Sequence, residues 1–289
     1  VSMGFITRNG STLYDGGSVY RFVSVNIPNY FILEDRAGTI AAKWHRVTAF
    51  EQRDACRAVK RLGGQLFRTY TFSVQGGVNV ENNLAHITGS NGTITYNETL
   101  FTDVDRGIAI AREEGLRMYI PLVDNWNWFG GYAEWASICG GGDFWTSTTV
   151  KTKFKEFITW LLNRTNTVTG VRYKDDPAIM AWELGNEIDK ANAAWISEMA
   201  AHIKSIDSKH LVIDGGHKSI PQVSLTDHNI DIVTTHYTDS QIASFTQTAA
   251  SYNKPYIYGE FSPDSDVTGI VNTIIEGGAA GCLIWSLRF

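Results

Sequence analysis

Eight short apolar segments recur along the 289-residue chain, and segments with helical periodicity separate most of them. Alternation of this kind predicts repeated βα units around a parallel sheet. Eight such units are the number that closes a (β/α)₈ TIM barrel, so we expect the α/β class and this architecture. We place the strands near residues 20–25, 65–69, 118–123, 179–184, 211–214, 232–235, 256–259 and 282–285.

The intervening segments predict helices at residues 49–61, 99–114, 148–166, 193–207, 240–252 and 267–276. Each has apolar residues three or four positions apart, which places them on one helical face. Gly115 follows one of these patterns directly, as expected of a helix end. The fifth crossover, residues 215–230, is too short for a long helix, and we expect it to be irregular.

The two ends of the chain refine this architecture. Residues 5–14 alternate around Asn9-Gly10, which is typical of a β-hairpin, and we expect it to cap the barrel bottom. Residues 1–289 suit one catalytic domain, which we expect to be a monomer. No helical pattern follows the eighth strand, so the eighth helix is missing from this sequence. We expect truncation, cleavage or another segment to account for it.

The composition excludes several kinds of partner. A formal net charge of −5 opposes binding to a phosphate backbone, and acidic residues dilute the basic clusters. No apolar run approaches the roughly 18 residues that a membrane span requires. We therefore expect neither nucleic acid nor membrane as a partner.

Cysteines and glycosylation motifs bear on the compartment. At most one disulfide is possible among Cys56, Cys139 and Cys282, and no CxxC metal pattern is present. N-glycosylation sequons begin at Asn91, Asn97 and Asn163, and no signal peptide precedes Gly4-Phe5. This pattern favours a mature, secreted glycoprotein.

Two glutamates end predicted strands and suggest a chemistry. Glu187 closes the segment 179–187, and Glu260 closes the segment 255–260. Barrel enzymes build their sites at the C-terminal ends of the strands, and two carboxylates can cut a glycosidic bond without metal or cofactor. A glycoside hydrolase is therefore the leading hypothesis. Glu183 lies within its strand, and we interpret it as a structural, hydrogen-bonded carboxylate.

Other polar and aromatic residues follow the same strand ends. Because these ends converge on the barrel axis, we expect one shared site. Its candidates are Arg68, the run Asp124-Asn125-Trp126, the pair His236-Tyr237 and Trp285.

A glycine-rich segment between Trp126 and Trp145 carries seven aromatic rings. Either they stack on sugars, or they pin a long loop to the barrel. Both interpretations stay open for each ring, and Trp126 is favoured for sugar because it directly follows a strand.

Other chemistries fit the sequence less well. His217, His236, Asp214 and Asp124 could support metal-assisted hydrolysis, but no HxH or HExxH spacing is present. A serine triad is disfavoured because no G-x-S-x-G motif occurs. A non-catalytic carbohydrate-binding barrel would use the aromatic loop but would need neither strand-end glutamate.

Several segments resemble the endo-β-1,4-mannanases of glycoside hydrolase family 5, in clan A. The most specific is residues 163–187, and the order of the segments matches the family over most of the chain. The others are Gly4-Phe5-Ile6-Thr7-Arg8, Asn125-Trp126, Phe129-Gly130-Gly131 and Trp285-Ser286-Leu287-Arg288.

The resemblance implies a retaining double displacement on mannan-type polysaccharides, without metal or cofactor. Glu187 would be the acid/base, with its pKa raised by Glu260, which would be the nucleophile. Asn186 would bind the sugar 2-hydroxyl. Arg68 and Tyr237 would orient Glu260, and His236 would belong to the same hydrogen-bond network. Trp285 would form the floor of the subsite on the non-reducing side of the cut, and Trp126 would contact sugar nearby.

Two departures from the family concern specificity. Family members usually continue the acid/base motif with Pro-Arg, whose arginine helps to bind the leaving-group sugar, whereas Ile188-Asp189 stand here. Only 73 residues separate Glu187 from Glu260, which is short for the family. An exo-acting β-mannosidase, or an enzyme acting on another β-linked glycan, therefore remains an alternative.

Overall fold

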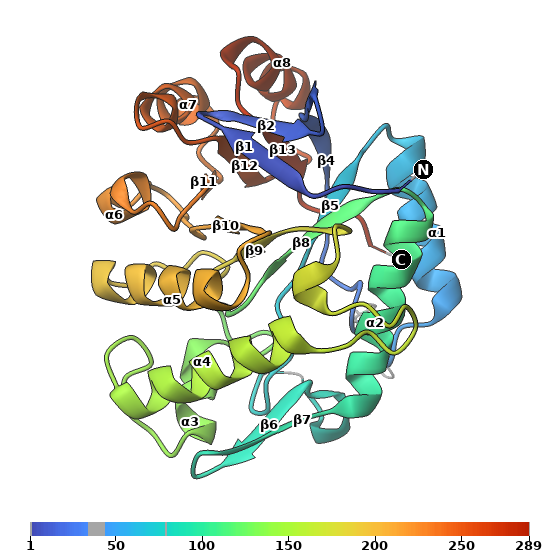
Figure 1. Cartoon of the computed structure of the whole chain (residues 1–289), viewed down its shortest axis with the longest axis vertical. Helices are drawn as coiled ribbons and strands as arrows, with labels where there is room; N and C mark the ends of the chain where they lie inside the picture. Colours follow the sequence, from blue (N-terminus) through green and yellow to red (C-terminus); the bar gives the residue numbers. More distant parts are fainter. Residues whose placement is uncertain (1, 34–43, 79, 289) are drawn as a thin grey trace.

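The computed structural model describes residues 2–33, 44–78 and 80–288 and contains an eight-stranded parallel barrel (Figure 1). Each barrel strand pairs in parallel with the next one along the chain, and a parallel bridge between Ile213 and Ile232 closes the circle. The predicted fold class is therefore confirmed. The strands are β4 (Phe22–Ile27), β5 (Leu66–Thr69), β8 (Arg117–Pro121), β9 (Ile179–Glu183), β10 (Leu211–Ile213), β11 (Val233–His236), β12 (Tyr256–Phe261) and β13 (Gly281–Ile284).

Six long helices surround the barrel at the predicted places. They are α1 (Ala49–Arg61), α2 (Glu98–Glu113), α4 (Thr148–Asn163), α5 (Ala193–Ile206), α7 (Ile242–Ser251) and α8 (Val267–Gly277). At the start of α1, Thr48 and Glu51 form a reciprocal capping box, which satisfies backbone donors at the helix end. Helix α4 ends three residues before the predicted position because Arg164 is extended and Thr165 pairs with Arg172.

Some elements differ from the sequence prediction. The fifth crossover is not wholly irregular, since it contains the five-residue helix α6 (Gln222–Thr226). A hairpin of β6 (Ile87–Ser90) and β7 (Thr93–Tyr96) and the helix α3 (Tyr132–Ile138) were not predicted. These elements are short, and their sequences lack a long periodic pattern. No helix in the described ranges is long and apolar enough to cross a membrane.

The apolar core has two main parts. Met180 and Ile257 belong to the cluster inside the barrel, whereas Ile179 and Trp182 pack in the larger cluster that includes the surrounding helices. A strand exposes alternate faces to the two clusters, which explains why these strands read as continuous apolar runs. Cys56, Cys139 and Cys282 are buried in this core as free thiols.

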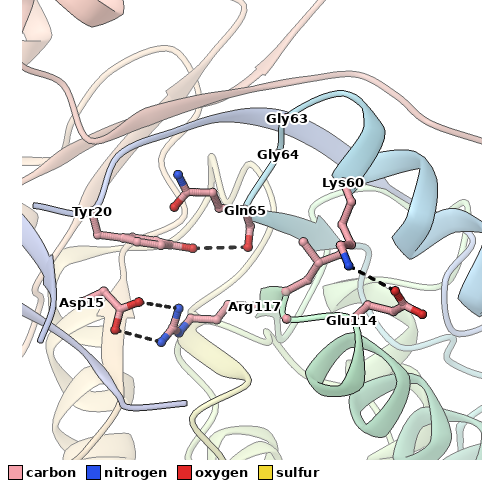
Figure 2. A pocket seen from close by; sticks show the side chains of 10 residues that line it. Asp15, Tyr20, Lys60, Gly63, Gly64, Gln65, Glu114 and Arg117 are labelled. Carbon is pink, nitrogen blue, oxygen red and sulfur yellow. Dashed lines mark hydrogen bonds and ion pairs between the residues drawn. The ribbon is translucent and has the colours of Figure 1, made fainter. Parts of the chain in front are cut away.

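The predicted hairpin consists of β1 (Ile6–Asn9) and β2 (Thr12–Asp15), and β3 (Ser18–Val19) extends it. From β2, Asp15 accepts two hydrogen bonds from the Arg117 guanidinium at 3.2 Å, and Arg117 also donates to the Gly4 carbonyl at 2.7 Å. Figure 2 shows Asp15 and Arg117 among the side chains that line a pocket of about 330 Å³. Because Arg117 opens β8, this contact joins the hairpin to the N-terminal end of the barrel.

We expect Arg117→Ala to lower the free energy of unfolding by about 1–3 kcal/mol, because it removes the charge-assisted hydrogen bonds that a buried guanidinium donates to Asp15 and to the Gly4 carbonyl. The Arg117 side chain is 7% exposed. Arg57 is the matched control: its side chain is 57% exposed and pairs with Glu114, so Arg57→Ala should cost less than about 1 kcal/mol. Urea denaturation measures both, and equal losses would contradict the anchoring role of Arg117.

Candidate active site

The guanidinium of Arg68 organises the C-terminal end of the barrel. Arg68 is fully buried on β5, and its Nε donates to Glu183 Oε1 at 2.8 Å. Its Nη1 donates to Glu260 Oε1 at 2.8 Å and to Asn26 Oδ1 at 3.0 Å. Its Nη2 donates to Asn186 Oδ1 at 2.7 Å. One side chain therefore fixes four groups at the ends of three other strands, β4, β9 and β12. Glu183 has the structural, hydrogen-bonded role that the sequence suggests.

A second chain of hydrogen bonds continues from Asn186. Its Nδ2 donates to Asp124 Oδ1 at 2.9 Å, and Tyr70 donates to Asp124 Oδ2 at 2.5 Å. Burial raises the pKa of Asp124 to about 7, although the bonds from Tyr70 and Asn186 oppose this change. Both amide atoms of Asn186 thus have a fixed direction.

Glu187 stands at a tight turn after β9, with φ at +52°. Three side chains surround its carboxylate. Trp126 Nε1 donates to Oε1 at 2.7 Å, His236 Nδ1 lies 2.9 Å from Oε2, and His217 Nε2 lies 3.2 Å from Oε2. The carboxylate is therefore held at both oxygens.

Glu260 lies near the end of β12, beside Glu187. It accepts hydrogen bonds from Arg68 and from the Tyr237 hydroxyl. One ligand atom each from Glu187, Glu260 and His236 all lie within 4.8 Å of one another. Two carboxyl groups about 5 to 5.5 Å apart are typical of retaining glycosidases, whereas inverting enzymes keep them farther apart.

The pKa directions in this free site are opposite to those expected. Burial by itself raises the pKa of Glu187, but His236, the Trp126 N–H and His217 outweigh it and bring the pKa to about 2. Burial raises the pKa of Glu260, and His236 and Arg68 oppose this change. The prediction of a raised pKa for Glu187 is therefore wrong for the free site, because three polar side chains favour its ionised form.

The site does not bring together the residues of the metal alternative. In the described part of the chain, the one group of three possible ligands comprises Glu187, His236 and Glu260. Asp214 lies apart and accepts backbone hydrogen bonds from Gly216 and Thr234. The Arg68 guanidinium already holds Glu260 Oε1, and its positive charge opposes a cation at this position.

Aromatic side chains line a pocket of about 230 Å³ beside the glutamates. Its lining residues are Pro28, Tyr70, Trp126, Trp128, Phe129, Trp285 and Arg288. Trp126 and Trp128 are 47% and 37% exposed. By contrast, Phe129, Trp135, Phe144 and Trp145 are buried and pin the loop to the barrel. The aromatic segment thus combines both of the roles that its sequence left open.

The structure brings all eight predicted site residues to this end of the barrel, in the hydrogen-bond network or in the aromatic pocket. It also adds Asn26, Tyr70, His217 and Asp189, which the sequence did not assign to a paired-carboxylate site. Each lies near the C-terminal end of a barrel strand or follows one, and this position was the signal in the sequence that could have identified it. Only the fold shows which of these side chains meet.

A parallel barrel with two neighbouring carboxylates at the C-terminal ends of its strands and aromatic rings beside them defines the class of barrel glycoside hydrolases. Within this class, residues 135–259 match the family model described as "GH family 5 beta-mannosidase-like". The resemblance to glycoside hydrolase family 5 is thereby confirmed.

One relative is mannan endo-1,4-beta-mannosidase 4 of Oryza sativa subsp. japonica, which is 40% identical over 183 residues. The match covers 58% of this chain and 36% of the relative. The chain therefore spans about a third of the length of this relative.

Two solved structures from Rhizomucor miehei share the fold. The endo-1,4-beta-mannanase has a TM-score of 0.84 at 23% identity, covering 98% of this chain and 90% of that one. The family 5 mannosidase has a TM-score of 0.78 at 20% identity, covering 98% and 86%.

We expect Arg68→Met to lower the free energy of unfolding by about 3–5 kcal/mol at pH 7, since it leaves buried carboxylates without their cation. Burial already raises the pKa of Glu183. Without Arg68, the pKa of Glu183 in the folded protein lies above its unfolded value of about 4.3. The loss of stability is therefore largest at neutral pH and becomes smaller as the pH falls towards that value. Denaturation at pH 7 and pH 5 measures this difference. Arg61→Met, at an exposed arginine of α1, is the control. A loss independent of pH would contradict the electrostatic explanation.

Proposed function

We propose that this protein hydrolyses β-1,4-mannosidic bonds of mannan-type polysaccharides by a retaining double displacement. The observation that carries the proposal is the placement of Glu187 after β9 and Glu260 on β12, with carboxylate oxygens that lie within 4.8 Å of each other. The mannan-cleaving relative and the family model support mannan as the substrate class.

In the first step, the Glu260 carboxylate attacks the anomeric carbon while Glu187 gives a proton to the departing glycosidic oxygen. The sugar then forms an ester with Glu260. In the second step, Glu187 takes a proton from a water molecule. The water oxygen attacks the anomeric carbon, and the bond between that carbon and Glu260 breaks, which releases the sugar. Each glutamate returns to its starting state. Arg68 and Tyr237 hold the Glu260 oxygens in place throughout.

The pocket beside the glutamates suits sugar rings. Exposed indoles offer flat apolar faces, on which the C–H faces of a pyranose can stack. Trp285 and Tyr70 pack edge to face with ring centroids 5.7 Å apart, so the Trp285 ring has a fixed orientation. We assign Trp285 and Trp126 to sugar contact on the two sides of this pocket.

An exo-acting β-mannosidase is the second candidate. The description of the family model and the fold shared with the Rhizomucor miehei mannosidase favour it. Activity on another β-linked glycan would use the same glutamates, whereas a carbohydrate-binding barrel would use only the aromatic pocket.

The first experiment compares the protein with Glu187→Gln and Glu260→Gln on linear β-1,4-mannan. We expect mixed oligosaccharides from the protein and a rate loss of at least about 10²-fold in either variant, because each removes a group needed in the transition state. Product size over time, resolved by chromatography, gives the measurement. Glu276→Gln, at an exposed glutamate of α8, is the matched control.

Each other outcome points to a different activity. Mannose as the sole product would assign an exo-mannosidase. Activity on another β-glycan but not on mannan would keep the mechanism and reject the substrate. Binding without hydrolysis of any β-linked glycan would reject the enzyme.

The two exposed tryptophans should separate binding from catalysis. Trp126→Phe keeps a ring but removes the N–H that Glu187 accepts, so kcat should fall by about tenfold or more with little change in KM. Trp128→Ala removes a ring without touching Glu187, and KM should rise instead. Steady-state kinetics on a soluble mannan measure both. The same pattern in both variants would contradict this division.

We also propose that the protein is a secreted, monomeric glycoprotein. Of the three sequons, the one at Asn91 suits a glycan best. Asn91 is exposed in the turn between β6 and β7. Asn97 instead caps α2 through Leu100 N, and Asn163 donates to Thr159 O.

A further inference from the structure

His217 joins Glu187 to Asp189. His217 Nδ1 lies 2.9 Å from Asp189 Oδ1, and its Nε2 lies 3.2 Å from Glu187 Oε2. The backbone contributes to this arrangement, since His236 N donates to the His217 carbonyl at 2.7 Å and Ile188 N donates to the Gly215 carbonyl at 3.2 Å. An imidazole thus lies between the carboxylates of Glu187 and Asp189.

The chemistry of the three groups restricts where protons can be. An ionised Asp189 can only accept, so His217 Nδ1 must carry a hydrogen. If His217 were neutral, its Nε2 lone pair would face Glu187 Oε2. That contact is favourable in two cases: either His217 is an imidazolium beside an ionised Glu187, or His217 is neutral beside a protonated Glu187. In both cases the pair holds one proton.

His236 does not compete for this proton. Its Nδ1 lies between Glu187 Oε2 at 2.9 Å and Glu260 Oε1 at 3.7 Å, so it carries a hydrogen towards the carboxylates. Its buried Nε2 has no hydrogen-bond partner among the described residues, which favours the neutral ring. His236 therefore donates to Glu187, whereas His217 is placed to exchange a proton with it.

The other charged groups around His217 leave this exchange intact. Lys218 Nζ donates to the Tyr237 carbonyl and lies 5.3 Å from the Tyr237 ring centroid. Asp214 lines a pocket of about 120 Å³ together with Asp189, His217 and Lys218, and backbone N–H groups hold its Oδ1. Glu260 and Arg68 pair with each other, and Glu260 Oε1 lies 3.7 Å from His236 Nδ1. Asp189 and Glu187 are the acidic groups in direct contact with the imidazole.

We propose that His217, held by Asp189, is a positioning residue that stores the proton which Glu187 delivers to the leaving group. This inference rests on the proposed function. In the first step, the proton moves from His217 Nε2 to the Glu187 carboxylate and on to the glycosidic oxygen, leaving His217 neutral. In the second step, the proton that Glu187 takes from water returns to His217. No other reactant is needed.

The free site requires such a store. Burial opposes the ionised form of Glu187, but the hydrogen bonds from His236 and Trp126 outweigh burial and lower the pKa of Glu187, and an ionised carboxylate cannot protonate a leaving group. An imidazolium at His217, whose Nε2 lies 3.2 Å from Glu187 Oε2, supplies the missing proton.

The kinetic experiment compares pH profiles of kcat/KM for the protein, His217→Gln and Asp189→Asn. Removing either group should move the alkaline limb to lower pH, by about one unit or more for His217→Gln, because Glu187 must then retain the proton alone. Asp189 is 46% exposed, so Asp189→Asn tests the relay where folding is not at risk. His228→Gln, at an exposed histidine outside the site, should leave the profile unchanged. A uniform loss of rate without movement of the limb would overturn the proposal.

A second measurement does not depend on hydrolysis. In the folded protein, NMR of the imidazole nitrogens follows the titration of His217 in the protein and in Glu187→Gln. We expect the midpoint to fall by about one unit or more in Glu187→Gln, since the imidazolium loses its anionic neighbour. An unchanged midpoint would overturn the shared proton. A shifted midpoint in a protein that cleaves no β-linked glycan would reject the proposed function and retain the proton-sharing pair.

Discussion

The fan of hydrogen bonds from Arg68 is the interaction on which the rest of the site depends. Its guanidinium is buried at the centre of the barrel mouth and donates to Asn26, Glu183, Asn186 and Glu260. A buried cation is costly unless it is paired and hydrogen-bonded, and these four acceptors engage all three guanidinium nitrogens. In return, the planar fork fixes the directions of the acceptors. A lysine could not replace it, because one ammonium cannot reach four acceptors on three separate strands.

Irregularities of the backbone, like the hydrogen bonds of Arg68, orient the side chains of the site. Glu187 and Tyr237 both have φ near +50°, a conformation that costs energy for residues other than glycine and is common at functional sites. The β11–β12 register shifts after Thr235, so that His236 pairs with Glu260. Gly259 makes this pairing possible, since a Cβ there would lie 2.5 Å from His236 Nε2. Small departures from regular strands thus aim the reacting side chains.

Sequence patterns sufficed for the barrel because each βα unit carries its own signal. Every barrel strand starts and ends within two residues of its predicted position, and the strand-end glutamates follow from the same reasoning. Pairing between distant residues has no such local signal. Nothing near Trp126 indicates that its N–H meets Glu187, 61 positions away, and nothing near Asp189 indicates His217. The prediction of a raised pKa for Glu187 was wrong for the same reason, since this pKa depends on side chains from three other strand ends.

The replacement of the expected arginine by Asp189 changes the character of the leaving-group side. An arginine at this position would present donors to a sugar, but Asp189 accepts from His217 and, at 3.4 Å, from Asn125 Nδ2. A cation there would also repel an imidazolium, whereas a carboxylate stabilises it. Under the proposed function, Asp189 would lack the sugar contact of the family's arginine and would instead stabilise the imidazolium that we propose as the proton store. The lost contact and the proposed relay would then be two consequences of one change in charge.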